Sequence, residues 1–122
     1  MTTTLVVDGA NVVGSRPDGW WRDRAGAARR LHERLLVGDL PQDVVVLVLE
    51  GAGKGGVPAG RDGHVRVVHA KGNGDDTIFS EARAAAEGGR VTVVTADRFL
   101  QSRVQGVGAT AVGPTWLWDR LD

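Results

Sequence analysis

The 122-residue sequence predicts a single α/β domain whose sheet is mainly parallel and has four to five strands. Short valine-rich runs recur along the chain, and they are continuous rather than alternating, as in strands covered on both faces. Helix-like stretches separate these runs, as crossovers between parallel strands require. No linker or internal repeat interrupts the pattern, so we expect one domain over residues 1–122.

The strands are expected wherever β-branched and aliphatic residues cluster between polar segments. Four runs meet this description: Leu5–Val7, Val44–Leu49, Val65–His69 and Val91–Thr95. A weaker fifth run, Thr110–Val112, lies near the end of the sequence. The sheet should therefore contain four strands, or five if the last run pairs.

Three segments have helical composition and spacing. Trp20–Val37 is rich in alanine, arginine and leucine with one apolar face, and Gly38 stands just past its end. Thr77–Glu87 is followed by two glycines that should stop it, and Arg98–Gln105 is a third helix. Between strands, residues 51–63 contain six glycines, so we expect a mobile loop there.

Composition excludes several classes of protein. The absence of cysteine rules out disulfide scaffolds, thiolate zinc sites and cysteine nucleophiles. Lysine plus arginine equals aspartate plus glutamate at 15 each, which excludes a polybasic nucleic-acid binder. No apolar run approaches membrane-spanning length and the start lacks a basic leader, so we expect a cytoplasmic protein. Edge strands and exposed tryptophans would permit a homodimer, which nothing in the sequence demands.

Acidic residues follow each of the four main strands. They are Asp8, Glu50, the pair Asp75 and Asp76, and Asp97. Because the carboxyl ends of parallel strands meet at one edge of the sheet, these carboxylates should converge. Converging carboxylates repel one another unless a cation or protons neutralise them, and an oxygen-only site without His or Cys favours Mg²⁺ or Mn²⁺.

Helix capping is the alternative interpretation of some of these acids. Asp is a preferred N-cap residue, so Asp75 or Asp76 and also Asp97 could simply begin the next helix. A cap explains Asp8 less well, because the residues that follow it, GANVVGSRP, predict no immediate helix. Capping also leaves unexplained why all the acids share one edge of the sheet.

Two polar residues accompany the acids. Gly9 allows a tight turn after which the Asn11 amide could point back toward Asp8, to orient a ligand carboxylate or to contact substrate phosphate. The alternative for Asn11 is an Asx-turn that closes the loop. Thr95 could donate a hydrogen bond to a carboxylate, or it could be a β-forming residue only.

Two other motifs carry less information. The segment GAGKGG at 51–56 is no phosphate-binding P-loop, because Val48 and Gly55 occupy positions that require Gly and Ser or Thr. The adjacent tryptophans at 20 and 21, and those at 116 and 118, are typical of a core. One of each pair should nevertheless face away from the core, where it could stack on a nucleobase.

Three blocks of the sequence resemble a known family. LVVDGANVVG, KGNGDDTIFSEA and VTVVTADRFLQSRVQGVGA occur in this order and span nearly the whole chain. They resemble the NYN domain of the PIN-like nuclease superfamily, which includes the YacP-like bacterial ribonucleases. The resemblance implies a three-layer α/β/α sandwich and RNA cleavage that depends on Mg²⁺ or Mn²⁺. The chain is shorter than typical YacP-like proteins.

The family pattern transfers directly to Asp8, Asn11 and Asp97. For the middle acid, Asp75 keeps the family's spacing to the following helix better than Asp76 does. Glu50 stands where related domains often have an acid after the second strand, although Asp is commoner there.

We therefore predict a metal-dependent ribonuclease. Asp8, Asp75 and Asp97 would bind the metal, Asp76 and Glu50 would assist, and Asn11 would share in catalysis. The residues expected to position substrate or ligands are Asn11, Thr95, Arg98, Arg16 and Lys71. Two alternatives stay open: a small-phosphate hydrolase such as a nucleotide pyrophosphohydrolase, and a non-catalytic module that binds RNA or protein.

Overall fold

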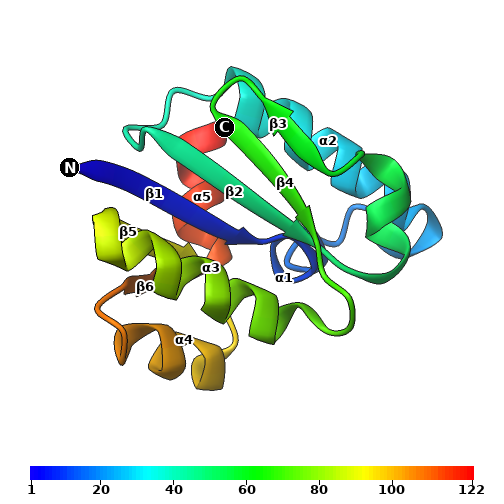
Figure 1. The fold of residues 1–122 in the computed structure, drawn as a ribbon. Coiled ribbons are helices and arrows are strands. Elements are labelled where there is room, and N and C mark those ends of the chain that lie inside the picture. The colour runs from blue at the N-terminus through cyan, green and yellow to red at the C-terminus, as the bar shows by residue number, and fades with distance from the viewer.

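Six strands form one mixed sheet at the centre of the computed structural model, which describes residues 1–122 (Figure 1). The strands are β1 (Thr2–Asp8), β2 (Val44–Leu49), β3 (Gly60–Asp62), β4 (Val65–His69), β5 (Gly89–Val94) and β6 (Thr110–Val112). Their spatial order is β3-β4-β2-β1-β5-β6, and every neighbouring pair is parallel except β3 and β4. The α/β class is therefore confirmed, and the carboxyl ends of β1, β2, β4 and β5 share one edge.

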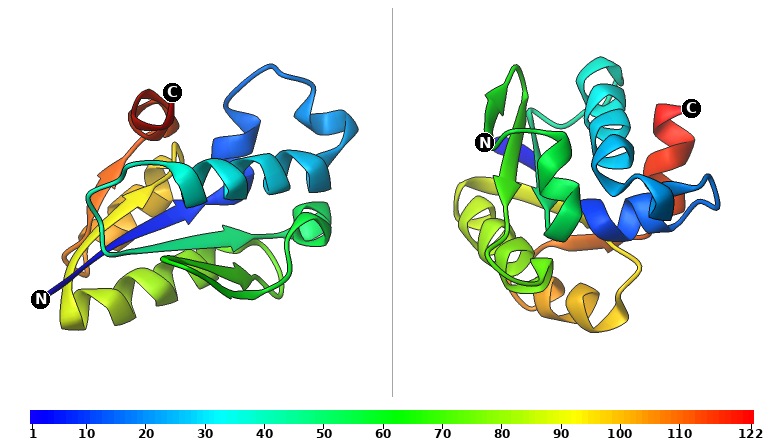
Figure 2. Two further views of the ribbon diagram at one scale, coloured as in Figure 1. Left: turned by 90° about the horizontal axis from the view of Figure 1, so that it is seen from above. Right: turned by 90° about the vertical axis from the view of Figure 1, so that its right-hand side faces the viewer.

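Helices cover both faces of the sheet. They are α1 (Gly9–Gly14), α2 (Arg24–Val37), α3 (Gly74–Gly88), α4 (Arg98–Gln105) and α5 (Pro114–Leu121), with 3₁₀ helices η1 (Trp20–Arg22) and η2 (Gly51–Gly56). Figure 2 shows α2 and α3 on opposite sides of the strands. Leu5 and Val7 of β1 point into a core shared with α1, α2 and α5, whereas Val6 points into a second core with α3 and α4. Burial on both faces explains why the strand runs are continuously apolar.

All five predicted strands are present in the structure. Val44–Leu49, Val65–His69 and Thr110–Val112 have the expected bounds, while β1 and β5 begin earlier than predicted. The sixth strand, β3, was not predicted. It contains three exposed residues with no apolar pattern, and it exists only because it pairs antiparallel with β4.

The helix predictions needed more correction. Arg98–Gln105 is confirmed with its bounds, whereas α3 begins three residues earlier than expected. Trp20–Val37 is not one helix. The chain breaks at Asp23, whose carboxylate accepts a hydrogen bond from the Gly26 N–H (2.9 Å) and so starts α2 afresh. Trp21 consequently lies outside the core with 51% of its surface exposed.

Two short helices that the sequence pattern did not predict, α1 and η2, depend on glycines whose backbone lies very close to a neighbouring segment. A Cβ at Gly9 would lie 2.6 Å from the Val48 carbonyl oxygen, so only glycine lets α1 begin directly after β1. A Cβ at Gly56 would lie 1.9 Å from the Ala25 carbonyl oxygen, so the expected loop is instead a 3₁₀ helix pressed against α2. The C-terminal helix α5 was also not predicted. No helix is both long and apolar enough to cross a membrane.

Candidate active site

Asp8 lies at the carboxyl end of the central strand β1 and is only 6% exposed. Its Oδ2 accepts a hydrogen bond from the Thr95 hydroxyl (2.9 Å), and its Oδ1 accepts one from the Asn11 N–H (3.3 Å). The second bond makes Asp8 the N-cap of α1. The expectation that no helix follows Asp8 at once was therefore wrong, and a cap accounts for part of its role.

Burial raises the pKa of the Asp8 carboxyl from 3.8 to about 6. The hydrogen bonds from Thr95 and Asn11 oppose this rise, while the negative charges of Glu50 and Asp75 add to it. A helix cap alone would not require a carboxylate whose ionisation is disfavoured in this way. A buried, strongly perturbed acid among like charges is typical of a functional site.

A chain of hydrogen bonds joins the end of β1 to the end of β5. Asn11 Oδ1 accepts from the Ala96 N–H (2.7 Å), so its side chain bridges two strand ends rather than turning back toward Asp8. The Thr95 hydroxyl, which donates to Asp8, also accepts from the Asp97 N–H (3.2 Å). Gln101 Nε2 donates to the Thr95 carbonyl oxygen (2.6 Å). Thr95 is fully buried, and its hydroxyl is directed at Asp8.

Asp97 caps helix α4, as the alternative interpretation anticipated. Its Oδ1 accepts hydrogen bonds from the N–H groups of Phe99 (2.9 Å) and Leu100 (3.1 Å). Both bonds use the same oxygen, so the second carboxylate oxygen stays available to a ligand. A cap and a ligand role are therefore compatible in this side chain.

The acids on the other side of the edge are arranged differently. Glu50 Oε2 accepts from the Gly74 N–H (2.7 Å) at the start of α3. Asn73 caps that helix, because its Oδ1 accepts from the Asp75 N–H (3.1 Å), so neither Asp75 nor Asp76 is the cap. Asp75 is half-buried and its charge acts on Asp8.

Asp76 points away from this group. Its side chain is 87% exposed, and its Oδ1 lies 3.2 Å from Nη1 of Arg103 on α4. The sequence favoured Asp75 over Asp76 as the principal ligand, and of the two only Asp75 influences the buried carboxylate.

The side chains as they stand form no group of three or more His, Asp or Glu that could hold a metal ion. The donor chemistry nevertheless fits Mg²⁺ or Mn²⁺, because Asp8, Glu50, Asp75 and Asp97 offer only oxygen atoms. Mutual repulsion already acts on Asp8, and a divalent cation would relieve it. The residues therefore have the right ligand atoms for such an ion, but their side chains do not converge on a single coordination site as they stand.

The predicted substrate-binding cations are scattered. Arg98 is exposed beside Asp97 at the start of α4. Lys71 is exposed and lines a cavity of about 420 Å³ with Asn73 and Asp76. Both lie near the edge of the sheet that carries Asp8, Glu50, Asp75 and Asp97, called the acidic edge from here on, where a phosphate could reach them.

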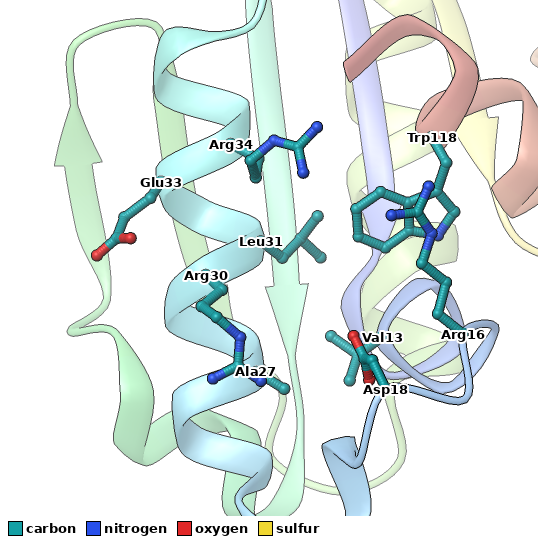
Figure 3. A pocket seen from close by; sticks show the side chains of 9 residues that line it. All are labelled: Val13, Arg16, Asp18, Ala27, Arg30, Leu31, Glu33, Arg34 and Trp118. Carbon is teal, nitrogen blue, oxygen red and sulfur yellow. The ribbon is translucent and has the colours of Figure 1, made fainter. Parts of the chain in front are cut away.

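Arg16 lies elsewhere. Figure 3 shows its guanidinium against the ring of Trp118 on α5, and the two are 3.9 Å apart, measured to the ring centroid. Arg16 also pairs with Asp122, whose other oxygen accepts from Nη2 of Arg34 (2.8 Å). Arg16, Arg34 and Trp118 line a cavity of about 310 Å³ between α2 and α5, so Arg16 lies apart from the acids that follow the strands.

The sequence did not point to a cavity beside Glu50. It measures about 420 Å³, and Trp20 and Arg24 line one side of it. The adjacent tryptophans were the one signal of it, but the sequence could not say which of the two rings faces the site.

Comparisons with known proteins bear on the fold. No protein-family model matches the chain, and no curated protein matches it. Crystal structures of Rae1 (YacP) from Bacillus subtilis do match. The W164L mutant is 21% identical with a TM-score of 0.77, over 98% of this chain and 74% of that one. A second structure of Rae1 is 20% identical with a TM-score of 0.71, over 97% of this chain and 72% of that one.

The chain has a YacP-like fold. This likeness agrees with the YacP-like part of the resemblance seen in the sequence, whereas the NYN and PIN-like assignment rests on the sequence motifs alone.

Proposed function

We propose that this protein is a metal-dependent ribonuclease that hydrolyses RNA phosphodiester bonds at the acidic edge of the sheet. The observation that carries the proposal is Asp8. Its carboxylate is buried, held by Thr95 and Asn11, and destabilised by the charges of Glu50 and Asp75. Such an arrangement costs folding free energy, which a ligand that needs the charge would recover.

The residues of the edge divide into ligands and positioning groups. Asp8, Asp75 and Asp97 would hold Mg²⁺ or Mn²⁺, and Glu50 would assist. The bound ion would supply a water of lowered pKa and stabilise charge on the phosphate oxygens. Thr95 holds one oxygen of Asp8 and so orients the other.

Two further groups serve the substrate. Asn11 ties the ends of β1 and β5 together by accepting a hydrogen bond from the Ala96 N–H, and Arg98, which follows Asp97, would bind a phosphate there. RNA as substrate is supported by the YacP-like fold together with the three sequence blocks that resemble YacP-like ribonucleases.

The test is Mn²⁺-dependent cleavage of one unstructured and one structured RNA by the wild type, Asp8→Asn and Asp76→Asn. We expect cleavage that requires the metal, is lost in Asp8→Asn and is kept in Asp76→Asn. Asp76 is the matched control because it is a neighbouring acid that faces solvent and Arg103. A folded Asp8→Asn variant with full activity would contradict the proposal.

A small-phosphate hydrolase is the second candidate. The zero net charge and the cavity of about 420 Å³ beside Glu50 suit a small nucleotide as well as a polymer. Release of phosphate or pyrophosphate from a panel of nucleotides, with RNA left intact, would favour this candidate.

A further inference from the structure

The cavity beside Glu50 is continuous with the acidic edge. Gly9, which follows Asp8 directly, lines it from one side, and Glu50 lines it from the end of β2. Gly72 and Asn73, just before α3, complete the rim. A molecule in this cavity would therefore touch the segments that carry Asp8, Glu50 and Asp75.

Trp20 forms the aromatic wall of the cavity. The ring is half-buried and packs near the end of α1, where a Cβ at Gly14 would lie 3.7 Å from it. Trp21 stands edge-on to Trp20, at 88° and 6.0 Å between centroids, and is 51% exposed. Only the first of the two tryptophans lines the cavity.

A cation stands beside this wall. The guanidinium carbon of Arg24 lies 5.2 Å from the centroid of the Trp20 ring, and Arg24 also lines the cavity. An indole and a guanidinium together present flat surfaces and positive charge, a combination suited to a nucleobase and its adjoining phosphate.

The glycine-rich helix η2 forms another part of the wall, and it is held in place. Lys54 Nζ donates to the Ala70 carbonyl oxygen (3.0 Å), and this bond ties η2 to the end of β4. Gly56 touches the backbone of Ala25 on α2. The residues that face the cavity, Gly51, Ala52 and Gly53, have little or no side chain, so they leave room for a flat ligand. The cavity is therefore formed before any ligand arrives.

We propose that this cavity binds one unpaired base of the RNA strand, stacked on Trp20, while the adjoining phosphate lies at the acidic edge. The volume falls in the range of small-ligand sites. A base within a duplex has both faces covered, so only an unpaired or extruded base can enter. The inference rests on the proposed function for the identity of the polymer, and it makes the enzyme selective for unpaired RNA.

The experiment measures binding separately from cleavage. A fluorescein-labelled single-stranded oligoadenylate of eight nucleotides and an abasic strand of the same length are titrated in EDTA, with anisotropy as the readout. Wild type should bind the base-bearing strand more tightly. Trp20→Leu should weaken that binding roughly 5- to 100-fold, to the level of the abasic strand. Trp20→Phe should keep part of it, and Trp21→Leu should match wild type.

Several outcomes would overturn the base site. They are equal affinity of wild type for the two strands, no binding of either strand, and full affinity in Trp20→Leu. The comparison of the base-bearing and abasic oligonucleotides uses only wild type, so it tests the base site even if Trp20→Leu does not fold. Loss of cleavage with base-dependent binding intact would reject the nuclease and keep the site. Cleavage without base-dependent binding would reject the site alone.

Discussion

The two halves of the acidic edge differ in how their acids are hydrogen-bonded and how far they are buried. On the β1 and β5 side, Asp8, Asn11 and Thr95 form a connected hydrogen-bond chain around a buried carboxylate. On the β2 and α3 side, Glu50 accepts one backbone hydrogen bond and Asp76 faces solvent. The first half is held by side-chain hydrogen bonds and is buried at Asp8 and Thr95, and the second is more open.

This contrast shows that the free-energy cost of the site falls mainly on Asp8. Hydrogen bonds hold Asp8 in one orientation, yet burial still raises the pKa of its carboxyl to about 6. The acids of α3 stand in the first turn of a helix, where negative charge is favourable and solvent is near. Substitution of the buried Asp8 should therefore change activity and stability in opposite directions, while substitution of the exposed Asp76 should change both very little.

Among these predictions, the largest change is expected in the rate of cleavage when Asp97 is replaced. Asp97→Asn keeps the oxygen that caps α4, because Asn is an equally good N-cap, but it removes the charge. We expect cleavage to fall by roughly 100-fold or more, with an unchanged thermal midpoint. Asp76→Asn provides the comparison on the other side and should retain nearly full cleavage. Equal losses in the two variants would remove the distinction between the halves.

The next effect is a gain in stability at Asp8. The raised pKa means that the folded state binds a proton more tightly than the unfolded state between about pH 4 and about pH 6. The stability supplied by the protonated carboxyl is therefore present below about pH 4 and is lost as pH rises through about 6. Asp8→Asn removes this loss.

For Asp8→Asn we expect the free energy of unfolding at pH 7 to rise by about 2 kcal/mol. The variant no longer has to keep a buried charge, and this gain is offset in part by one weakened hydrogen bond to the new amide. Urea denaturation in EDTA at several pH values measures it. The wild-type stability relative to the variant should fall between pH 4 and pH 6. A variant that is less stable than wild type at pH 7 would show that the carboxylate is not under strain.

A smaller effect is expected at Thr95. The Thr95 hydroxyl donates a hydrogen bond to Asp8, and this bond lowers the pKa of the Asp8 carboxyl. Thr95→Val removes the hydroxyl, so the pKa of Asp8 should rise above about 6 and the pH profile of cleavage should move upward. We expect a rate loss of roughly tenfold, as for other groups that orient a ligand. Thr95→Ser keeps the hydroxyl and should stay close to wild type. An unmoved pH profile in Thr95→Val would argue against its role in positioning Asp8.

The smallest effect is expected at the exposed pair of Asp76 and Arg103. The Asp76 side chain is 87% exposed, so Arg103→Met should change the free energy of unfolding by less than about 0.5 kcal/mol. Thermal unfolding at low and high salt measures the difference. A larger, salt-dependent loss would mean that the open side of the edge is stabilised electrostatically after all.

The strands and the acids that follow them could be predicted because both are local properties of the chain. Continuous runs such as Val44–Leu49 report burial on both faces, and parallel pairing then brings the following acids to one edge. The same logic fails for β3, since its exposed residues become a strand only through β4.

The helix at Gly9 shows the limit of local patterning in the site itself. Six residues are too few to show a helical period, and the decisive feature is the contact between Gly9 and the Val48 carbonyl. That contact lies across the sheet, so no inspection of GANVVG could reveal it. The role of Asp8 as a cap followed from it and was missed for the same reason.

The sequence by itself determined the α/β class, the order of the main strands along the chain and the set of acids at their ends, because these depend on hydrophobic runs and neighbouring residues. Only the tertiary structure decided which acid is buried, that Asp75 rather than Asp76 acts on it, and that Trp20 rather than Trp21 faces the cavity. Those outcomes depend on distances between segments far apart in the chain, and burial converts such distances into shifted pKa values and a shaped cavity.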